Sequence, residues 1–219
     1  MELHDALAAR RSVRAFLPRD VPRELLVEIF ADAQRAPSWC NIQPWRIALF
    51  SGAARVRLVE TLTAAATRGG LHTDFDWPTG YPEPYGTHRK ECGKALYSAM
   101  GVARDDHSGR QQAWMRNFAA FDAPHVGLVG LDRRLGIYAA LDVGCWLQSV
   151  LLAATARGVA SCAQASLATF SNDARPLCGW DEHIGLLFGV ALGYEDTGAK
   201  ANATRTTRAA LGENVRFVD

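Results

Sequence analysis

The first residues equipped for chemistry form the basic run RRSVR, at positions 10–14. Its guanidinium groups and its hydroxyl supply charge-assisted donors, which a bound phosphate dianion requires. A second cationic pair, Arg205 and Arg208, stands near the far end of the chain. Taken alone, each group is more typical of a solvated turn or a basic tail. The two groups predict a phosphate site only if the fold brings them together.

A second group of polar residues lies in the irregular turn APSWCNIQPW, residues 36–45. Pro37 ends the preceding helical pattern, and Ser38 and Asn41 present short polar side chains just before a strand pattern. Such a turn can direct hydroxyl and amide groups at the edge of a planar heterocycle. A helix-to-strand loop capped by serine and asparagine explains this segment equally well.

Several familiar motifs are absent from the sequence. It contains neither GxxxxGK[ST] nor GxGxxG, so any nucleotide must be held in another way. HExxH, GxSxG and SxxK are also missing, and the six histidines are scattered. The five cysteines form no CxxC pair, which favours buried thiols over a disulfide frame or a zinc site. We therefore expect no metal and no side-chain nucleophile.

Taken together, these segments resemble the nitroreductase family of FMN-dependent oxidoreductases. The match comprises an Arg-x-Ser-x-Arg start, a Pro-Ser-x-x-Asn-x-Gln-Pro-Trp turn, a strand over 184–194 ending in Leu-Gly-Tyr, and an Arg-rich C-terminal segment. It runs through essentially the whole chain in order. The resemblance implies a nitroreductase that takes electrons from NADH or NADPH. Nitroaromatic or related acceptors would be reduced by a ping-pong, two-electron mechanism.

The resemblance also implies roles for individual positions. The basic run and the C-terminal arginines match contacts to the FMN phosphate and ribityl chain, and the turn matches contacts to the flavin ring and ribityl hydroxyls. Segment 163–166 matches backbone amides near flavin N5, although Ala163 stands where a proline is usual. Asn117 aligns with a region that reaches the ring from the partner subunit. The implied cofactor-binding residues are Arg10, Arg11, Ser12, Arg14, Pro37, Ser38, Asn41, Asn117, Gln164, Ala165, Ser166, Arg205 and Arg208.

The elements that must position these residues follow from hydrophobic periodicity. Helical patterns span residues 2–9, 22–36, 53–68, 88–102, 109–121 and 137–157, and strand patterns span 45–50, 125–131, 159–166 and 184–192. Helices outnumber strands and no regular βαβ alternation occurs, so we expect a single α+β domain over residues 1–219. The resemblance implies a central, mostly antiparallel sheet flanked by helices.

A proline-rich, aromatic loop spans residues 69–86. Trp77, Tyr81 and Tyr85 offer planar surfaces of the kind that a lid over an aromatic substrate needs, although the same residues could simply anchor a long loop. Two further aromatic residues, Tyr97 and Phe118, lie on the next two helical patterns. We predict that they line the substrate pocket.

The composition is that of a globular protein. The 219 residues include 24 Lys+Arg and 23 Asp+Glu, a net charge of +1, so no strong field attracts nucleic acid or an anionic membrane. The uncharged, strongly apolar stretch over residues 143–156 is shorter than the roughly 20 apolar residues that span a bilayer. The N-terminus has no apolar signal core. We expect a cytoplasmic protein with no nucleic-acid or membrane partner.

The long apolar pattern over 137–157 has more hydrophobic perimeter than one small domain readily covers, which predicts a homodimer. The resemblance adds that FMN lies at the subunit interface. It also implies that the basic segment 199–219 embraces the partner, as in a dimer with swapped tails.

Two alternatives stay open at this point. Dehalogenases similar to iodotyrosine deiodinase, and flavin-destroying enzymes, share the RRSxR opening within the same fold. A non-catalytic module that binds flavin or an anion is an alternative from a different class. An RNA-binding domain is disfavoured because the net charge is close to zero.

Overall fold

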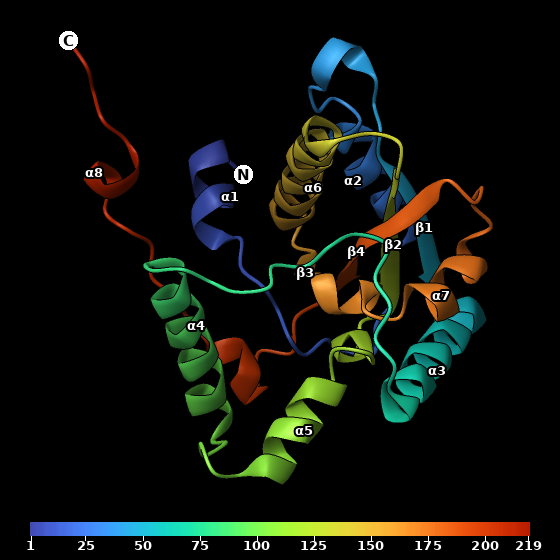
Figure 1. Cartoon of the computed structure of the whole chain (residues 1–219), viewed down its shortest axis with the longest axis vertical. Coiled ribbons are helices and arrows are strands. Elements are labelled where there is room, and N and C mark those ends of the chain that lie inside the picture. Colours follow the sequence, from blue (N-terminus) through green and yellow to red (C-terminus); the bar gives the residue numbers. More distant parts are fainter.

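A four-stranded sheet forms the centre of the molecule, with helices on both faces (Figure 1). The computed structural model describes residues 1–219. The strands are β1 (Arg46–Ser51), β2 (His125–Asp132), β3 (Ala160–Gln164) and β4 (Ile184–Gly193), in the spatial order β1-β2-β4-β3. Every neighbouring pair is antiparallel, which confirms the α+β prediction.

The helices also follow the predicted pattern, with shifted ends. They are α1 (Leu3–Ala9), α2 (Arg23–Ala33), α3 (Gly52–Arg68), α4 (Tyr85–Met100), α5 (His107–Met115), α6 (Ile137–Ala156), α7 (Ser171–Ala174) and α8 (Leu211–Asn214). Short 3-10 turns are η1 (Trp39–Asn41), η2 (Ala120–Asp122), η3 (Ala165–Ala168), η4 (Arg175–Cys178) and η5 (Lys200–Ala203).

Three predicted elements are clearly longer than the observed ones. The helix expected over 22–36 ends at Ala33. The helix expected over 109–121 ends at Met115, because the chain then turns through three consecutive residues with positive φ, at 120–122. A right-handed helix cannot include that conformation. The strand expected over 159–166 ends at Gln164, where η3 begins.

Each face of the sheet is covered by its own hydrophobic cluster. α2 and α6 supply one cluster, and α3 with the segments around η3 and α7 supply the other (Figure 1). Trp146 of α6 is fully buried, and its ring stacks 6.2 Å from Phe30 and 6.2 Å from Trp45. This stack fixes α6 against α2 and the entry to β1.

α6 is long and apolar enough to cross a membrane by length and composition alone. In the fold it packs against α1, α2 and the sheet, so that its inner face is core. Its first turns are uncovered: Ile137, Tyr138 and Leu141 are 80%, 58% and 62% exposed. The helix is therefore a core element whose apolar first turns are largely exposed.

The N-terminal segment extends the sheet beyond β3. Ser12 forms a parallel bridge with Ser161 of β3, and the N–H of Val13 donates to the Ser161 carbonyl at 3.0 Å. Farther along, the N–H of Leu17 donates to the carbonyl of Tyr194, at the end of β4, at 2.8 Å. These bonds place the basic run beside the end of the sheet where β3 begins.

His125, at the start of β2, is a buried histidine with both ring nitrogens engaged. Its Nε2 accepts from the N–H of Val21 at 2.9 Å, so the ring proton is on Nδ1 and points to the Ser51 hydroxyl at 2.6 Å. His125 therefore donates to Ser51 and cannot act as its base. Burial lowers the pKa of His125, against the opposite influence of the Asp20 carboxylate.

This pairing predicts an acid-sensitive fold. Because folding lowers the His125 pKa, the unfolded chain binds the proton more readily, and stability falls as the pH drops below the ordinary value of about 6.5. Protonating Nε2 also leaves the buried Val21 N–H unpaired, at a cost of about 1–3 kcal/mol. Chemical denaturation at about pH 7.5 and about pH 5 should show this loss in the wild type.

Two variants isolate the contribution of His125. His125→Asn should be less stable at neutral pH and should lose most of the pH dependence, because the buried histidine whose pKa is lowered by folding is gone. His88→Asn, at an exposed histidine of α4, should keep the wild-type pH profile. An unchanged profile in His125→Asn would contradict the assignment.

Candidate functional site

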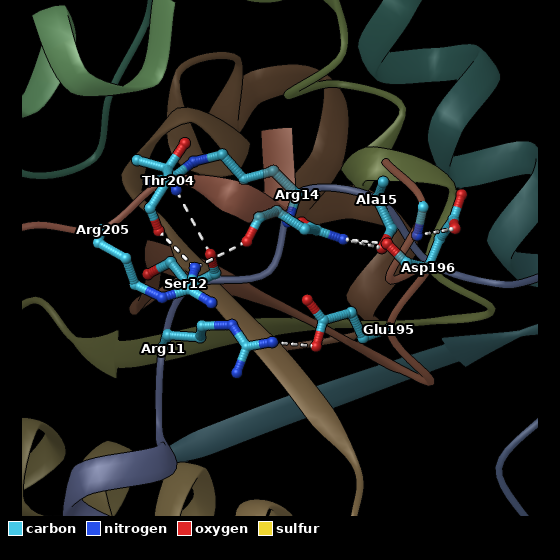
Figure 2. A network of polar contacts seen from close by, with 10 residues as sticks. Arg11, Ser12, Arg14, Ala15, Glu195, Asp196, Thr204 and Arg205 are labelled. Carbon is cyan, nitrogen blue, oxygen red and sulfur yellow. Dashed lines mark hydrogen bonds and ion pairs between the residues drawn. The ribbon is translucent and has the colours of Figure 1, made fainter. Parts of the chain in front are cut away.

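Asn202 of η5 joins the two ends of the chain. It is 5% exposed. Its Oδ1 accepts from the N–H of Arg14 at 2.7 Å, and its Nδ2 donates to the carbonyls of Ala15 at 2.9 Å and Asp196 at 2.8 Å. Figure 2 shows the resulting network of polar contacts between residues 11–15 and 195–205. No sequence motif marks Asn202, because its side chain binds only backbone groups.

The network gathers several of the predicted phosphate-binding residues. Arg205 is drawn beside Ser12 in Figure 2, and its guanidinium donates to the carbonyls of Asn202 and Thr204 at 2.8 and 2.9 Å. Arg14 donates to the carbonyl of Ser12 at 3.4 Å. We call residues 10–14 together with Arg205 the phosphate cradle.

Two arginines differ from the others in their surroundings. Arg11 forms an ion pair with Glu195, so one of its amino groups is already engaged. Its Nε is buried and has no hydrogen-bond partner in the protein. Arg208 lies three residues beyond Arg205, exposed, and donates to the Thr206 hydroxyl and the Thr207 carbonyl. No contact joins it to Ser12.

A second polar cluster forms where β3 ends. The amide of Gln164 donates to the backbone carbonyl of Asn117 at 3.1 Å, and the Ser166 hydroxyl donates to Asn117 Oδ1 at 3.3 Å. Gln164 is 5% exposed, and its Oε1 has no hydrogen-bond partner in the protein. Three predicted ring contacts therefore lie together, with an unpaired buried acceptor among them.

Local packing explains why the chain turns here. η3 lies directly on β4, and a Cβ at Gly189 would be 2.5 Å from Leu167 Cδ1, so only glycine permits this approach. The first N–H groups of a helical turn have no partner within the turn. The amides at Ala165 and Ser166, at the start of η3, therefore have no partner within the turn, and their contact with a ligand stays a prediction.

β3 fixes the spacing between these two clusters. Ser161, which pairs with Ser12, and Gln164 are three residues apart on the same strand. At about 3.3 Å per strand residue, the phosphate cradle and the Gln164 cluster are about 10 Å apart. The two clusters thus lie in line along β3, the edge strand of the sheet.

The polar turn, residues 37–43, adopts an unusual backbone conformation. Cys40, Asn41 and Gln43 have φ values of 48°, 57° and 47°, in the left-handed region that costs most side chains energy. The Ser38 hydroxyl accepts from the Gln43 N–H at 3.0 Å. These features hold the Ser38 and Asn41 side chains at the tip of a defined turn.

Asp142 of α6 anchors this turn, which the sequence analysis did not foresee. Its carboxylate is 7% exposed and accepts from the Trp39 N–H at 3.1 and 3.2 Å. The Trp39 ring also meets Tyr138 edge-on, with ring centroids 4.6 Å apart. The turn is thus fixed to the first half of α6.

The phosphate cradle lies at the opposite end of the same helix. α6 ends at Ala156 and leads directly into β3, whose Ser161 pairs with Ser12 (Figure 1). The 14 residues from Asp142 to Ala156 span about 21 Å at 1.5 Å per residue. The polar turn and the cradle of one chain therefore cannot enclose the same small ligand.

The prediction that Phe118 lines the substrate pocket is wrong. Phe118 is fully buried in the core, with its ring centroid 4.7 Å from that of Trp114 and 5.3 Å from that of Phe170. It follows the early end of α5, which turns it inward and away from any pocket. Tyr97 is half-buried on α4, under the guanidinium of Arg110.

The base of the 69–86 loop is fixed to the body of the protein, whereas its aromatic part is exposed. Asp74 is buried, accepts from the Leu186 N–H at 2.7 Å and lies 3.5 Å from the Arg175 Nε. Trp77, Tyr81 and Tyr85 are 45%, 48% and 62% exposed. Their proposed action as a lid stays a prediction.

Cys162 and Cys178 are poor nucleophiles. Burial raises the pKa of Cys162, which lies beside the cradle on β3, to about 11. Burial also raises the pKa of Cys178 to about 12. Both thiols are protonated at neutral pH, so neither supplies the thiolate that covalent catalysis would need.

Comparison with known proteins gives a consistent result. A model of the Nitroreductase family matches residues 7–194. The chain is 37% identical over 212 residues to nitroreductase NfnB of Mycolicibacterium smegmatis, covering 96% of this chain and 90% of that protein. It is 34% identical over 224 residues to a 4-nitrobenzoate reductase of Nocardioides sp., covering 100% and 91%.

Solved structures of nitroreductases have the same fold as this chain. The crystal structure of an FMN and NADPH-dependent nitroreductase NfnB from Sphigopyxis sp. strain HMH superposes with a TM-score of 0.97 at 36% identity, over 100% of both chains. That of the FMN-dependent nitroreductase NfnB from Mycobacterium smegmatis in complex with NADPH gives a TM-score of 0.95 at 36% identity, again over 100% of both.

Proposed function

The chain belongs to the nitroreductase family, and from this premise we propose that it is an FMN-dependent NAD(P)H oxidoreductase that reduces nitroaromatic acceptors. Its relatives include a nitroreductase and a 4-nitrobenzoate reductase. Similar solved structures are described as FMN-dependent, and one of them contains NADPH. The observation that carries the proposal is the elongated site along β3, with cations at one end and amides at the other.

The residues of this site fit FMN. The phosphate cradle offers guanidinium groups and a hydroxyl to a phosphate dianion, and the buried Arg11 Nε lacks a partner. About 10 Å away, Gln164 Oε1 is a buried acceptor without a donor, and a flavin ring carries both donors and acceptors on its edge. A ribityl chain would bridge the two ends.

When bound, FMN supplies a ring that takes two electrons from NAD(P)H and passes them to the acceptor. The protein residues position this ring and set its electrostatic surroundings. Asn117 holds Gln164 and Ser166 at the ring end, and the free amides of η3 supply donors there. The site contains no thiolate, and none is required.

We further propose a homodimer in which each site is shared between two chains. The polar turn and the phosphate cradle lie at opposite ends of α6, about 21 Å apart along its axis. A two-fold axis near the middle of α6 would bring the partner's turn to this chain's cradle. It would also cover Ile137, Tyr138 and Leu141, which are exposed in the single chain.

The C-terminal tail supports the same arrangement. Leu211, Phe217 and Val218 are 65%, 78% and 79% exposed, because the tail extends away from the sheet (Figure 1). We propose that residues 204–219 pack on the partner. A reaction that consumes NAD(P)H is consistent with a cytoplasmic protein.

The absorption spectrum of the purified protein tests the proposed function. We expect a yellow protein with one non-covalent FMN per chain, bleached by NAD(P)H without oxygen and reoxidised by a nitroaromatic acceptor. A yellow protein that neither NADH nor NADPH bleaches would support the non-catalytic flavin-binding module instead. A protein without flavin that gains none from added FMN would contradict both.

A further inference from the structure

A cavity on the outer side of α4 is strongly basic. It has a volume of about 950 Å³ and lies between α4, the connection to α5, and α5. We call it the basic groove. Its lining includes five cationic side chains and no carboxylate: Arg89, Lys90, Lys94, Arg104 and Arg110.

None of these five cations forms an ion pair, whereas arginines elsewhere in the chain do. The carboxylates nearest in sequence do not line the groove. Asp106 caps α5 by accepting from the Gly109 N–H at 2.8 Å, and Glu91 lines the cavity on the other side of α4. In a chain of net charge +1, this unbalanced cluster is a local exception.

The groove also has a shaped apolar floor. Arg110 lies 4.4 Å from the centre of the Tyr97 ring, a cation–π contact that fixes both side chains. Gly93 lies one helical turn before Tyr97, and its position carries no side chain to fill the space. A planar group could therefore enter beside Tyr97 while anionic groups meet the surrounding cations.

The groove adjoins the proposed flavin site. Cys92 lines both the basic groove and the cavity on the opposite side of α4. That second cavity is lined by Arg205, which belongs to the phosphate cradle, and by Arg208. The two cavities meet at Cys92, so a long ligand in the groove could extend toward the phosphate end of the flavin site.

We propose that the basic groove binds the adenosine 2′,5′-bisphosphate end of NADPH and selects NADPH over NADH. The inference rests on the proposed function, which supplies the need for a nicotinamide donor. A 2′-phosphate carries about 1.5–2 negative charges at neutral pH, which NADH lacks. Five cations match such a polyanion better than the single charge of a carboxylated acceptor.

Binding of adenosine 2′,5′-bisphosphate to the FMN-loaded protein, measured by calorimetry, tests this assignment without turnover. We expect it to bind at least about 10-fold more tightly than adenosine 5′-monophosphate, since each charge-assisted contact is worth more than a factor of ten. The double variant Lys94→Gln, Arg104→Gln should lose at least about 10-fold in affinity for the bisphosphate. Its FMN content and unfolding temperature should stay at wild-type values.

A matched control removes two charges elsewhere. Arg23→Gln with Arg57→Gln changes exposed arginines of α2 and α3 that form no ion pair, and should bind the bisphosphate as the wild type does. In steady-state assays, the groove variant should raise KM for NADPH about 10-fold, with kcat and KM for NADH within about two-fold.

Equal affinity for the two nucleotides in the wild type would overturn the assignment, as would a groove variant that behaves like the control. A KM that rises only for 4-nitrobenzoate and not for nitrobenzene would overturn it too, and would assign the groove to the acceptor. A protein that binds the bisphosphate through Lys94 and Arg104 but never oxidises NADPH would contradict the proposed function and support the groove.

Discussion

Replacing Asn202 with Ala is expected to lower the free energy of unfolding by about 2–4 kcal/mol and to remove most of the bound FMN. The side chain makes three hydrogen bonds from a buried position, each worth about 0.5–1.5 kcal/mol, and its loss leaves the Arg14 N–H unpaired. The carbonyls of Ala15 and Asp196 each keep one backbone donor. These bonds join the N-terminal run to the segment that carries Arg205. Without them, the two halves of the phosphate cradle should separate.

Chemical denaturation and the flavin content of the purified protein measure the two effects. Asn172→Ala, at an exposed asparagine of α7 whose side chain makes no hydrogen bond, is the matched control. It should change the free energy of unfolding by no more than about 0.5 kcal/mol and the flavin content by no more than about a tenth. If Asn202→Ala keeps its flavin and matches Asn172→Ala in stability, Asn202 does not organise the site.

The second large effect concerns two variants, one in the phosphate cradle and one in the polar turn, which lie near opposite ends of α6. Arg205→Glu replaces a phosphate donor with a repelling charge, and Asn41→Ile places a β-branched side chain at a φ of 57°, where it is strained. Each change should cost at least about 2–3 kcal/mol of FMN binding, a loss of more than about 30-fold. Each variant should therefore be purified with little or no flavin.

Matched substitutions make this loss interpretable. Arg216→Glu reverses a charge in the same tail, outside the phosphate cradle, and should keep its flavin. Asn41→Gly permits the left-handed backbone without strain and should recover the turn, while losing only the amide contact. Full flavin content in Arg205→Glu would show that the tail is not part of the phosphate site. Full flavin content in Asn41→Ile would show that the polar turn is not part of the FMN site.

The sequence predicts the fold well because its signals are local. Alternating residues indicate the strands, and Pro22 and Gly158 mark the ends of helices. The errors occur where tertiary packing decides. α5 ends at Met115 and the chain turns sharply, so that Phe118 enters the core and cannot line a pocket. No periodicity encodes such a turn.

The site is predictable only in part, for a related reason. Its ligand-facing residues belong to motifs, and the resemblance identifies them at once. Asn202, Glu195 and Asp142 support those residues through backbone contacts or ion pairs between distant segments. Such partners become visible only when the fold brings the segments together. The basic groove is similar, because its cations come from α4, α5 and their connection.

The central claim is that one FMN site is built from two chains, and co-expression of Arg205→Glu with Asn41→Ile tests it most directly. In a mixed dimer, one site combines both defects and the other has neither. Random pairing makes half of the dimers mixed, so flavin content should return to about one quarter of the wild-type value per chain. A mixture as free of flavin as the separate variants would contradict the shared site.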